Sequence, residues 1–83
     1  MIQDIKETLK EHILKTFLPG ENPNELTDTT PLITGGILDS IATLQVVAFI
    51  EERYGFTFQA HEVDVKNLDT IAAITNFILS KKS

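Results

Sequence analysis

Ser40 is the side chain best placed for covalent chemistry, because it follows Asp39 directly where an apolar helical pattern begins. The pair also has a structural explanation, since serine is a favoured N-cap and aspartate is favoured near the positive end of a helix. A nucleophilic serine needs a base, and the only histidines are His12 and His61. The G-x-S-x-G pattern of many hydrolases is missing from Leu38-Asp39-Ser40-Ile41-Ala42. We therefore do not expect a catalytic triad or an enzyme.

Metal and phosphate-loop sites are also poorly supported by the sequence. His12, His61, Glu62 and Asp64 do not form a dense ligand cluster, and the absence of cysteine excludes a thiolate zinc site. Gly35-Gly36 belongs to neither of the common glycine-rich phosphate-binding patterns. The glycine pair instead predicts a tight turn before the helix.

A third interpretation of Ser40 is that it carries a covalently attached phosphate group. The N-terminus of a helix offers free backbone amides and a positive dipole end, both of which favour a bound phosphate. A serine at this position is exposed, so its modification leaves the core undisturbed. The apolar side chains just after Ser40 would then form a docking face for a partner.

The composition predicts one small acidic domain spanning residues 1–83. Apolar residues make up 42% of the chain, enough for one compact core but not for a buried catalytic cavity as well. Acidic residues outnumber basic residues by 12 to 7, which disfavours binding to nucleic acid. No apolar run is long enough for a membrane span, and no targeting segment is visible. With no cysteine for disulfides, we expect a cytoplasmic location. Because the sequence begins at Met1 and ends at Ser83, we expect a free-standing protein, and we expect it to be a monomer.

Apolar spacing predicts an all-α fold with three longer helices and one short helix. The first helix is expected at residues 2–17, where Pro19-Gly20 stops it, and the second from Asp39-Ser40 to Gly55. One or two helical turns are expected within residues 60–65. Asp69 or Thr70 should cap a last helix that ends at about Leu79 and frays beyond it.

Residues 18–39 form a long first connection that we expect to be ordered. A loop of this length in a small domain is usually functional or packed by its own side chains. The apolar residues available for this packing are Leu26, Leu32, Ile33 and Ile37. The predicted core consists of Ile5, Leu9, Ile13, Val46, Phe49, Ile50, Ile71, Ile74 and Ile78.

Three segments of the chain resemble those of a known family. The segment Gly36-Ile37-Leu38-Asp39-Ser40-Ile41, followed by Phe49-Ile50-Glu51-Glu52-Arg53-Tyr54-Gly55, resembles the acyl and peptidyl carrier proteins. Residues 67–74, Asn-Leu-Asp-Thr-Ile-Ala-Ala-Ile, are similar to the last loop and helix start of that family. The order and lengths of the elements fit across essentially the whole chain. The resemblance implies a four-helix carrier-protein bundle.

The resemblance also implies a function for individual residues. Ser40 matches the serine that receives 4′-phosphopantetheine from coenzyme A, and Asp39 matches the acidic residue that helps the phosphopantetheinyl transferase to engage. The carrier would hold an acyl or aminoacyl group as a thioester, while its partner enzymes perform the chemistry. The positions that match partner docking in the family are Ile41, Leu44, Ala48, Glu51 and Glu52.

The sequence departs from the fatty-acid carriers at two positions. Ala42 and Gln45 stand where those carriers have acidic residues. The pattern is closer to free-standing acyl, aminoacyl or D-alanyl carriers, which are loaded by an AMP-forming ligase and pass their cargo to downstream acyl-using enzymes. Two alternatives stay open: a carrier for fatty-acid or polyketide chains, and an unmodified helical interaction module in which Ser40 is only a helix cap.

Overall fold

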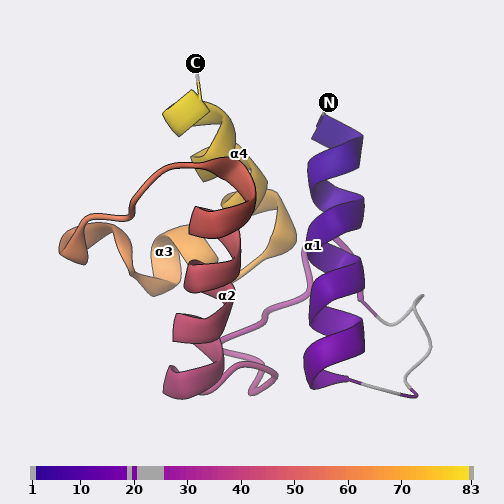
Figure 1. Cartoon of the computed structure of the whole chain (residues 1–83). Coiled ribbons are helices and arrows are strands. Elements are labelled where there is room, and N and C mark those ends of the chain that lie inside the picture. The colour runs from indigo at the N-terminus through magenta and orange to yellow at the C-terminus, as the bar shows by residue number, and fades with distance from the viewer. Residues whose placement is uncertain (1, 19, 21–25, 83) are drawn as a thin grey trace.

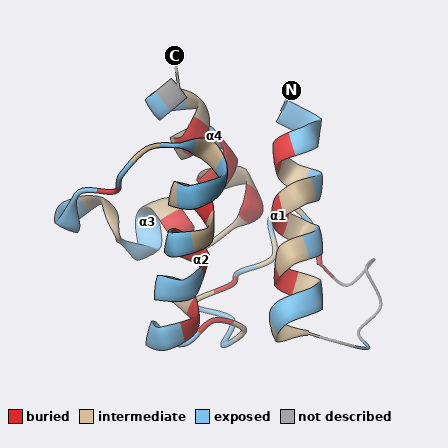
Figure 2. Cartoon of the chain, viewed as in Figure 1, coloured by how far each residue is buried: buried red, intermediate tan, exposed pale blue. Residues whose placement is uncertain are grey.

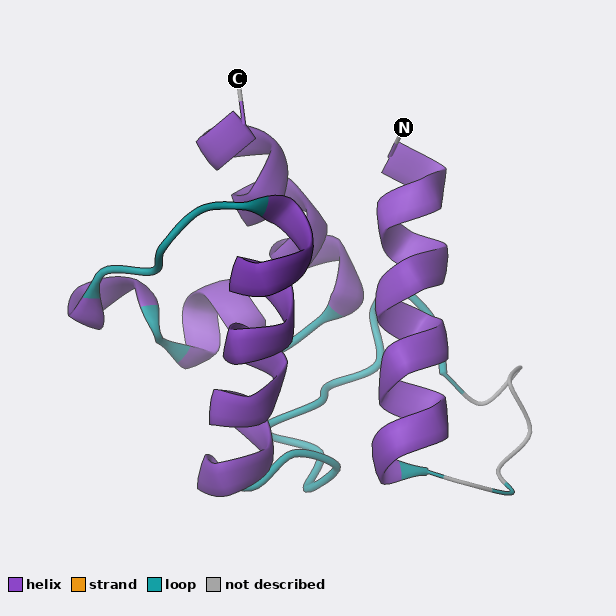
Figure 3. Ribbon diagram, in the orientation of Figure 1, coloured by secondary structure: helices purple, strands orange, loops and turns teal. Residues whose placement is uncertain are grey.

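Four α-helices make up most of the chain in this computed structural model, which describes residues 2–18, 20 and 26–82 (Figure 1). No strand occurs within these ranges (Figure 3). The helices are α1 (Ile2–Phe17), α2 (Ser40–Tyr54), α3 (Val65–Leu68) and α4 (Ile71–Lys82), and a 3₁₀ turn, η2, covers Ala60–Glu62. The all-α prediction, with three longer helices and a short one, is therefore confirmed.

Helix α1 has the bounds that its apolar spacing predicts. Ile5, Leu9 and Ile13 repeat at every fourth residue, so they share one face, and all three are buried. The helix ends at Phe17, while Pro19, to which the sequence assigns the stop, lies outside the described residues.

Helix α2 also has its predicted bounds, but its apolar residues lie on two faces. Gly55 ends the helix in the left-handed region, with φ of 75°, and its amide donates to the Glu51 carbonyl. Phe49 packs against the core but is only partly buried, so its predicted burial is confirmed only in part. Ile41 and Leu44 are exposed, although their spacing also suits the buried stripe. The residues of α2 that are buried are Ala42, Val46, Val47 and Ile50.

The C-terminal third differs from its prediction in two ways. The predicted turns at residues 60–65 are divided into the 3₁₀ turn at Ala60–Glu62 and α3, which begins only at Val65. Helix α4 continues to Lys82 instead of fraying after Leu79. The Thr70 hydroxyl oxygen accepts a hydrogen bond from the Ala73 amide at 3.0 Å, so Thr70 caps α4 and Asp69 does not.

The core lies where α4 packs against α1 and α3 (Figure 2). Ile71, Ile74 and Ile78 are fully buried, as are Leu9 and Ile13. Apart from Phe49, all of the predicted core residues are buried.

The described part of the first connection is laid over this core, as expected. Leu26 and Leu32 are buried, and Ile33 and Ile37 pack against the core from partly exposed positions. The Asp28 carboxylate pairs with Lys6 and Lys10 of α1, at 2.9 and 2.8 Å, and these lysines lower the pKa of Asp28. The Gly36 amide donates a hydrogen bond to the Ile33 carbonyl, and Gly36 has a φ of 82°. This left-handed conformation, which glycine adopts without strain, confirms the predicted glycine turn.

Figure 1 shows how the chain ends are placed relative to α2. The first turn of α1 and the last turn of α4 lie on one side of the molecule, and the first turn of α2 lies on the opposite side. In the described ranges, no helix combines the length and the apolar character that crossing a membrane requires.

Candidate functional site

Asp39, and not Ser40, is the N-cap of α2. Its backbone is extended, with φ of −84° and ψ of −173°, and its Oδ1 accepts a hydrogen bond from the Ala42 amide at 2.7 Å. The Asp39 carbonyl accepts from the Thr43 amide at 2.9 Å and from the Thr43 hydroxyl at 2.7 Å. Ser40 is already the first helical residue. The interpretation of Ser40 as a helix cap is therefore wrong.

Because Asp39 is the N-cap, the Ser40 hydroxyl takes no part in capping α2. Ser40 is exposed at the first turn of α2. As at the start of any α-helix, the amides of Ser40 and Ile41 have no carbonyl acceptor within the helix. The Ala42 amide donates instead to the Asp39 side chain. An exposed hydroxyl therefore lies next to two amides at the positive end of a helix dipole.

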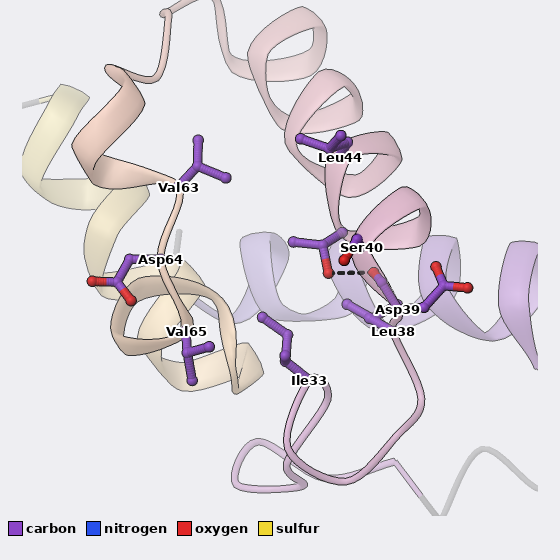
Figure 4. Close-up of a pocket in the computed structure, with 9 residues that line it drawn as sticks. Ile33, Leu38, Asp39, Ser40, Leu44, Val63, Asp64 and Val65 are labelled. Atoms are coloured by element: carbon purple, nitrogen blue, oxygen red, sulfur yellow. Dashed lines mark hydrogen bonds between the residues drawn. The ribbon is translucent and has the colours of Figure 1, made fainter.

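Ser40 lies at the edge of a hollow of about 480 Å³, called here the Ser40 hollow (Figure 4). Three segments line it. Ile33 and Leu38 come from the first connection, Asp39, Ser40, Thr43 and Leu44 from the start of α2, and Val63, Asp64 and Val65 from the segment that leads into α3. The size falls in the range of small-molecule sites, and five of the lining side chains are aliphatic.

Asp69 joins two of these walls, although it does not line the hollow itself. Its Oδ1 accepts from the amides of Ile33 and Thr34, both at 2.9 Å, and its Oδ2 accepts from the Thr34 hydroxyl at 2.9 Å. Its own amide donates to the Val65 carbonyl at 2.9 Å. The Thr34 amide, followed by the other donors, lowers the pKa of Asp69.

An exposed apolar face lies beside the hollow. Ile41 is 69% exposed and Leu44 is 59% exposed, and Val65 across the hollow is 42% exposed. Ala48 is exposed one helical turn beyond Leu44. These positions suit the docking role that the family resemblance implies for Ile41, Leu44 and Ala48.

The two glutamates at the end of α2 differ in their surroundings. Glu51 is partly buried, and its Oε2 accepts a hydrogen bond from the Phe58 amide at 2.8 Å. This carboxylate therefore ties the residues after α2 back to the helix. Glu52 is exposed and lies beside Phe49 and Arg53, so it is the glutamate more available to a basic partner.

The histidines and their acidic neighbours do not come together. His12 stacks on Phe49, and burial lowers its pKa. His61 is exposed, and Glu62 pairs with Lys81 at 2.6 Å, which lowers the pKa of Glu62. Nowhere in the part of the chain that is described do three potential metal-ligating side chains gather.

Asp69 is the residue that sequence reasoning assigned to a different role. It was a candidate cap for the last helix, and its partners Ile33 and Thr34 are 36 and 35 residues away. A pattern of local spacing carries no signal for such a contact. The only hint is that Asp69 is directly followed by Thr70, a second residue able to cap.

Comparison with known proteins adds no family assignment. No protein-family model matches the chain, and a search of curated proteins finds no match either. Function is therefore inferred from the residues of the chain itself.

Proposed function

We propose that this chain is a carrier protein in which Ser40 bears 4′-phosphopantetheine donated by coenzyme A. The observation that carries the proposal is an exposed serine at the first turn of α2, freed from capping by Asp39 and set beside the Ser40 hollow. The helix order, with one short helix and a long first connection, suits a four-helix carrier bundle.

The residues around Ser40 fit the prosthetic group. The phosphodiester would be held covalently by Ser40, close to the amides of Ser40 and Ile41 and to the positive end of the helix dipole. Asp39 already caps the helix, so the modification displaces no hydrogen bond of that cap. When bound, the group supplies a thiol on which an acyl or aminoacyl cargo is held as a thioester.

Attachment is a phosphoryl-group transfer that balances without a further reactant. The Ser40 oxygen attacks the phosphorus of coenzyme A that carries pantetheine. A new P–O bond forms, the bond between the two phosphates breaks, and adenosine 3′,5′-bisphosphate leaves. The serine proton passes to a base of the transferase, since the two histidines lie elsewhere: His12 stacks on Phe49 and His61 precedes α3.

The exposed apolar face then serves recognition. Ile41, Leu44 and Ala48 offer an uncharged surface one, two and three turns into α2, while Glu52 adds a charge near its end. The partners are a phosphopantetheinyl transferase, an AMP-forming acyl or aminoacyl ligase and downstream enzymes that use the acyl group. The protein itself is a cytoplasmic monomer that positions cargo and performs no catalysis.

A second candidate is an unmodified helical interaction module. The exposure of Ile41, Leu44 and Val65 favours it, because neighbouring apolar side chains at a surface often mark a binding face. The third candidate, a carrier for fatty-acid or polyketide chains, is less well matched, because the fatty-acid carriers have acidic residues where Ala42 and Gln45 stand. Gln45 is exposed and uncharged, and Ala42 is buried, so neither supplies a charge to a basic partner.

Mass spectrometry tests the proposal. The purified protein is incubated with coenzyme A and a transferase of broad specificity, and its intact mass should rise by one phosphopantetheine. Ser40→Ala should gain nothing, and Ser80→Ala, the matched control on α4, should be modified like the parent. A parent chain that remains unmodified, or a Ser40→Ala variant that is modified, would overturn the assignment. Loading with candidate ligases then distinguishes aminoacyl from fatty-acyl cargo.

A further inference from the structure

Asp69 is hydrogen-bonded to two of the three segments that line the Ser40 hollow. On one side its carboxylate accepts from the Ile33 and Thr34 amides, and its carbonyl accepts from the Leu32 amide at 2.6 Å. On the other side its amide donates to the Val65 carbonyl. Ile33 and Val65 both line the hollow, as Figure 4 shows, so one residue between α3 and α4 connects the two walls.

The wall that contains Ile33 is also held by the side chains of Leu32 and Leu38, which are buried in the core. Within it, the Gly36 amide donates to the Ile33 carbonyl at 3.1 Å and the Leu38 amide donates to the Leu32 carbonyl at 2.8 Å. These bonds shape the turn but do not fix its distance from α3. The Ile33 side chain is itself only partly buried. The bonds from Asp69 therefore provide a direct polar connection between this wall and the α3–α4 junction.

A carboxylate suits this position better than a neutral acceptor. Three donors converge on it, two backbone amides and the Thr34 hydroxyl. Hydrogen bonds to an ionised acceptor are about twice as strong as those between neutral groups. The lowered pKa of Asp69 agrees with a carboxylate that stays ionised among these donors.

We propose that Asp69 is a positioning residue that fixes the spacing between the Ile33 wall and the Val65 wall of the Ser40 hollow. The spacing sets the shape of the surface around Ser40 that a phosphopantetheinyl transferase contacts. This role in transferase binding rests on the carrier function proposed above. Asp69 does not line the hollow and none of its hydrogen bonds reaches Ser40, so its effect passes through the two walls.

The test compares Asp69→Ala with Asp69→Asn, Thr34→Ala and Asp28→Ala. Asparagine keeps an oxygen for the two amides, and Thr34→Ala removes only the hydroxyl donor. Asp28→Ala is the matched control: it also removes an acid that anchors the first connection, but that anchor binds Lys6 and Lys10 of α1 and lies outside the Ser40 hollow.

Two readouts are measured on each full-length variant. The first is hydrogen exchange at the Ile33 and Thr34 amides together with the methyl chemical shifts of Leu44 and Val65, and it requires no carrier function. The second is the transfer of phosphopantetheine from coenzyme A, resolved into kcat and KM for the carrier. All rates are compared at a temperature at which each variant is folded.

For Asp69→Ala, exchange at both amides should be at least about tenfold faster, because the bonds lost are to a charged acceptor. Its methyl shifts should move and its KM should rise at least about threefold with kcat little changed. Asp69→Asn should show exchange rates, methyl shifts and a KM close to those of the parent. The changes in Thr34→Ala should be larger than those in Asp69→Asn and smaller than those in Asp69→Ala. Asp28→Ala should leave the two amides, the methyl shifts and KM like the parent.

The proposal is overturned if Asp69→Ala leaves the two amides and the methyl groups unchanged, or if Asp28→Ala changes them to the same extent. If Asp69→Ala does not fold, the proposal is tested by the smaller effects expected for Asp69→Asn and Thr34→Ala. Exchange rates and methyl shifts equal to those of the parent in both variants would overturn it. If the parent itself takes up no phosphopantetheine, the carrier function fails, while exchange and methyl shifts still decide the role of Asp69.

Discussion

The imidazole ring of His12 lies face to face with the phenyl ring of Phe49, with centroids 3.8 Å apart and planes 7° from parallel. The contact joins α1 to α2. Phe17 meets the same imidazole edge-on, with the centroids 6.2 Å apart. Glu11, Lys15 and Arg53 surround the stack at the surface. The stack brings together a histidine that the sequence assigns to no ligand cluster and a phenylalanine that it assigns to the core.

A first prediction concerns the pH dependence of stability. Burial lowers the pKa of His12 below its ordinary value of 6.5. Between the two values the unfolded chain binds more protons than the folded chain, so stability falls as the pH falls from 6.5 to the folded pKa. Above pH 6.5 this contribution is complete. Urea unfolding between pH 5 and 8 should show the loss, and His12→Gln should flatten it.

The control for this effect is His61→Gln, because His61 is exposed and outside the stack. It should keep the parental slope of stability against pH. A parental slope in His12→Gln would show that the stack does not carry the dependence.

A second prediction compares Phe49→Ala with Ile50→Ala. Phe49 is partly buried, so its removal should cost only about 1–2 kcal/mol of unfolding free energy, well below the usual cost for a buried phenylalanine. Ile50 is fully buried, and its removal should cost about 2–5 kcal/mol. Chemical denaturation measures both. Equal losses, or a larger loss at Phe49, would contradict the two-faced arrangement of α2.

A third prediction follows from the cap of α2. Asp39→Ala removes the acceptor for the Ala42 amide and should cost about 1 kcal/mol, within the usual range for an N-cap. Ser40→Ala removes a hydroxyl outside the cap and should change stability by less than about 0.5 kcal/mol. Thermal unfolding followed by circular dichroism ranks the two variants, and the opposite order would restore Ser40 as the cap.

A fourth prediction tests docking at Ala48. Since Ala48 is exposed, Ala48→Arg should fold like the parent but raise KM for the loading ligase at least about threefold. Asn76→Arg, at an exposed position of α4, is the control and should load normally. Loading should weaken only modestly as salt rises, because the face beside Ser40 is largely apolar. A collapse in salt with a normal Ala48→Arg variant would mean that charge governs docking.

Helix bounds could be predicted wherever the chain has strong local signals. The four-residue repeat of Ile5, Leu9 and Ile13 defines α1, and Gly55 ends α2 in a conformation that glycine adopts without strain. The end of α4 lacks such a signal. The Lys81 ammonium pairs with Glu62 and lies 5.5 Å from the centre of the Phe77 ring. These contacts hold the last turn of α4, which its polar sequence alone predicts to fray.

The site could be predicted only in part, for the same physical reason. Asp39 and Ser40 are both good capping residues, and the extended backbone at Asp39 decides between them. Apolar residues on both faces of α2 leave the burial of Phe49 undecided until α1 is in place. The contacts of Asp69 cross 36 residues and depend on the path of the whole first connection.

The placement of the chain ends has a practical consequence for handling the protein. The first turn of α1 and the last turn of α4 lie on the side opposite to Ser40. An affinity tag, a fluorescent fusion or a surface tether at either end would therefore leave the serine facing outward. When the protein is immobilised through either end, Ser40 should remain accessible to soluble enzymes. The binding of these enzymes could then be measured on a sensor chip without changing the sequence of the protein.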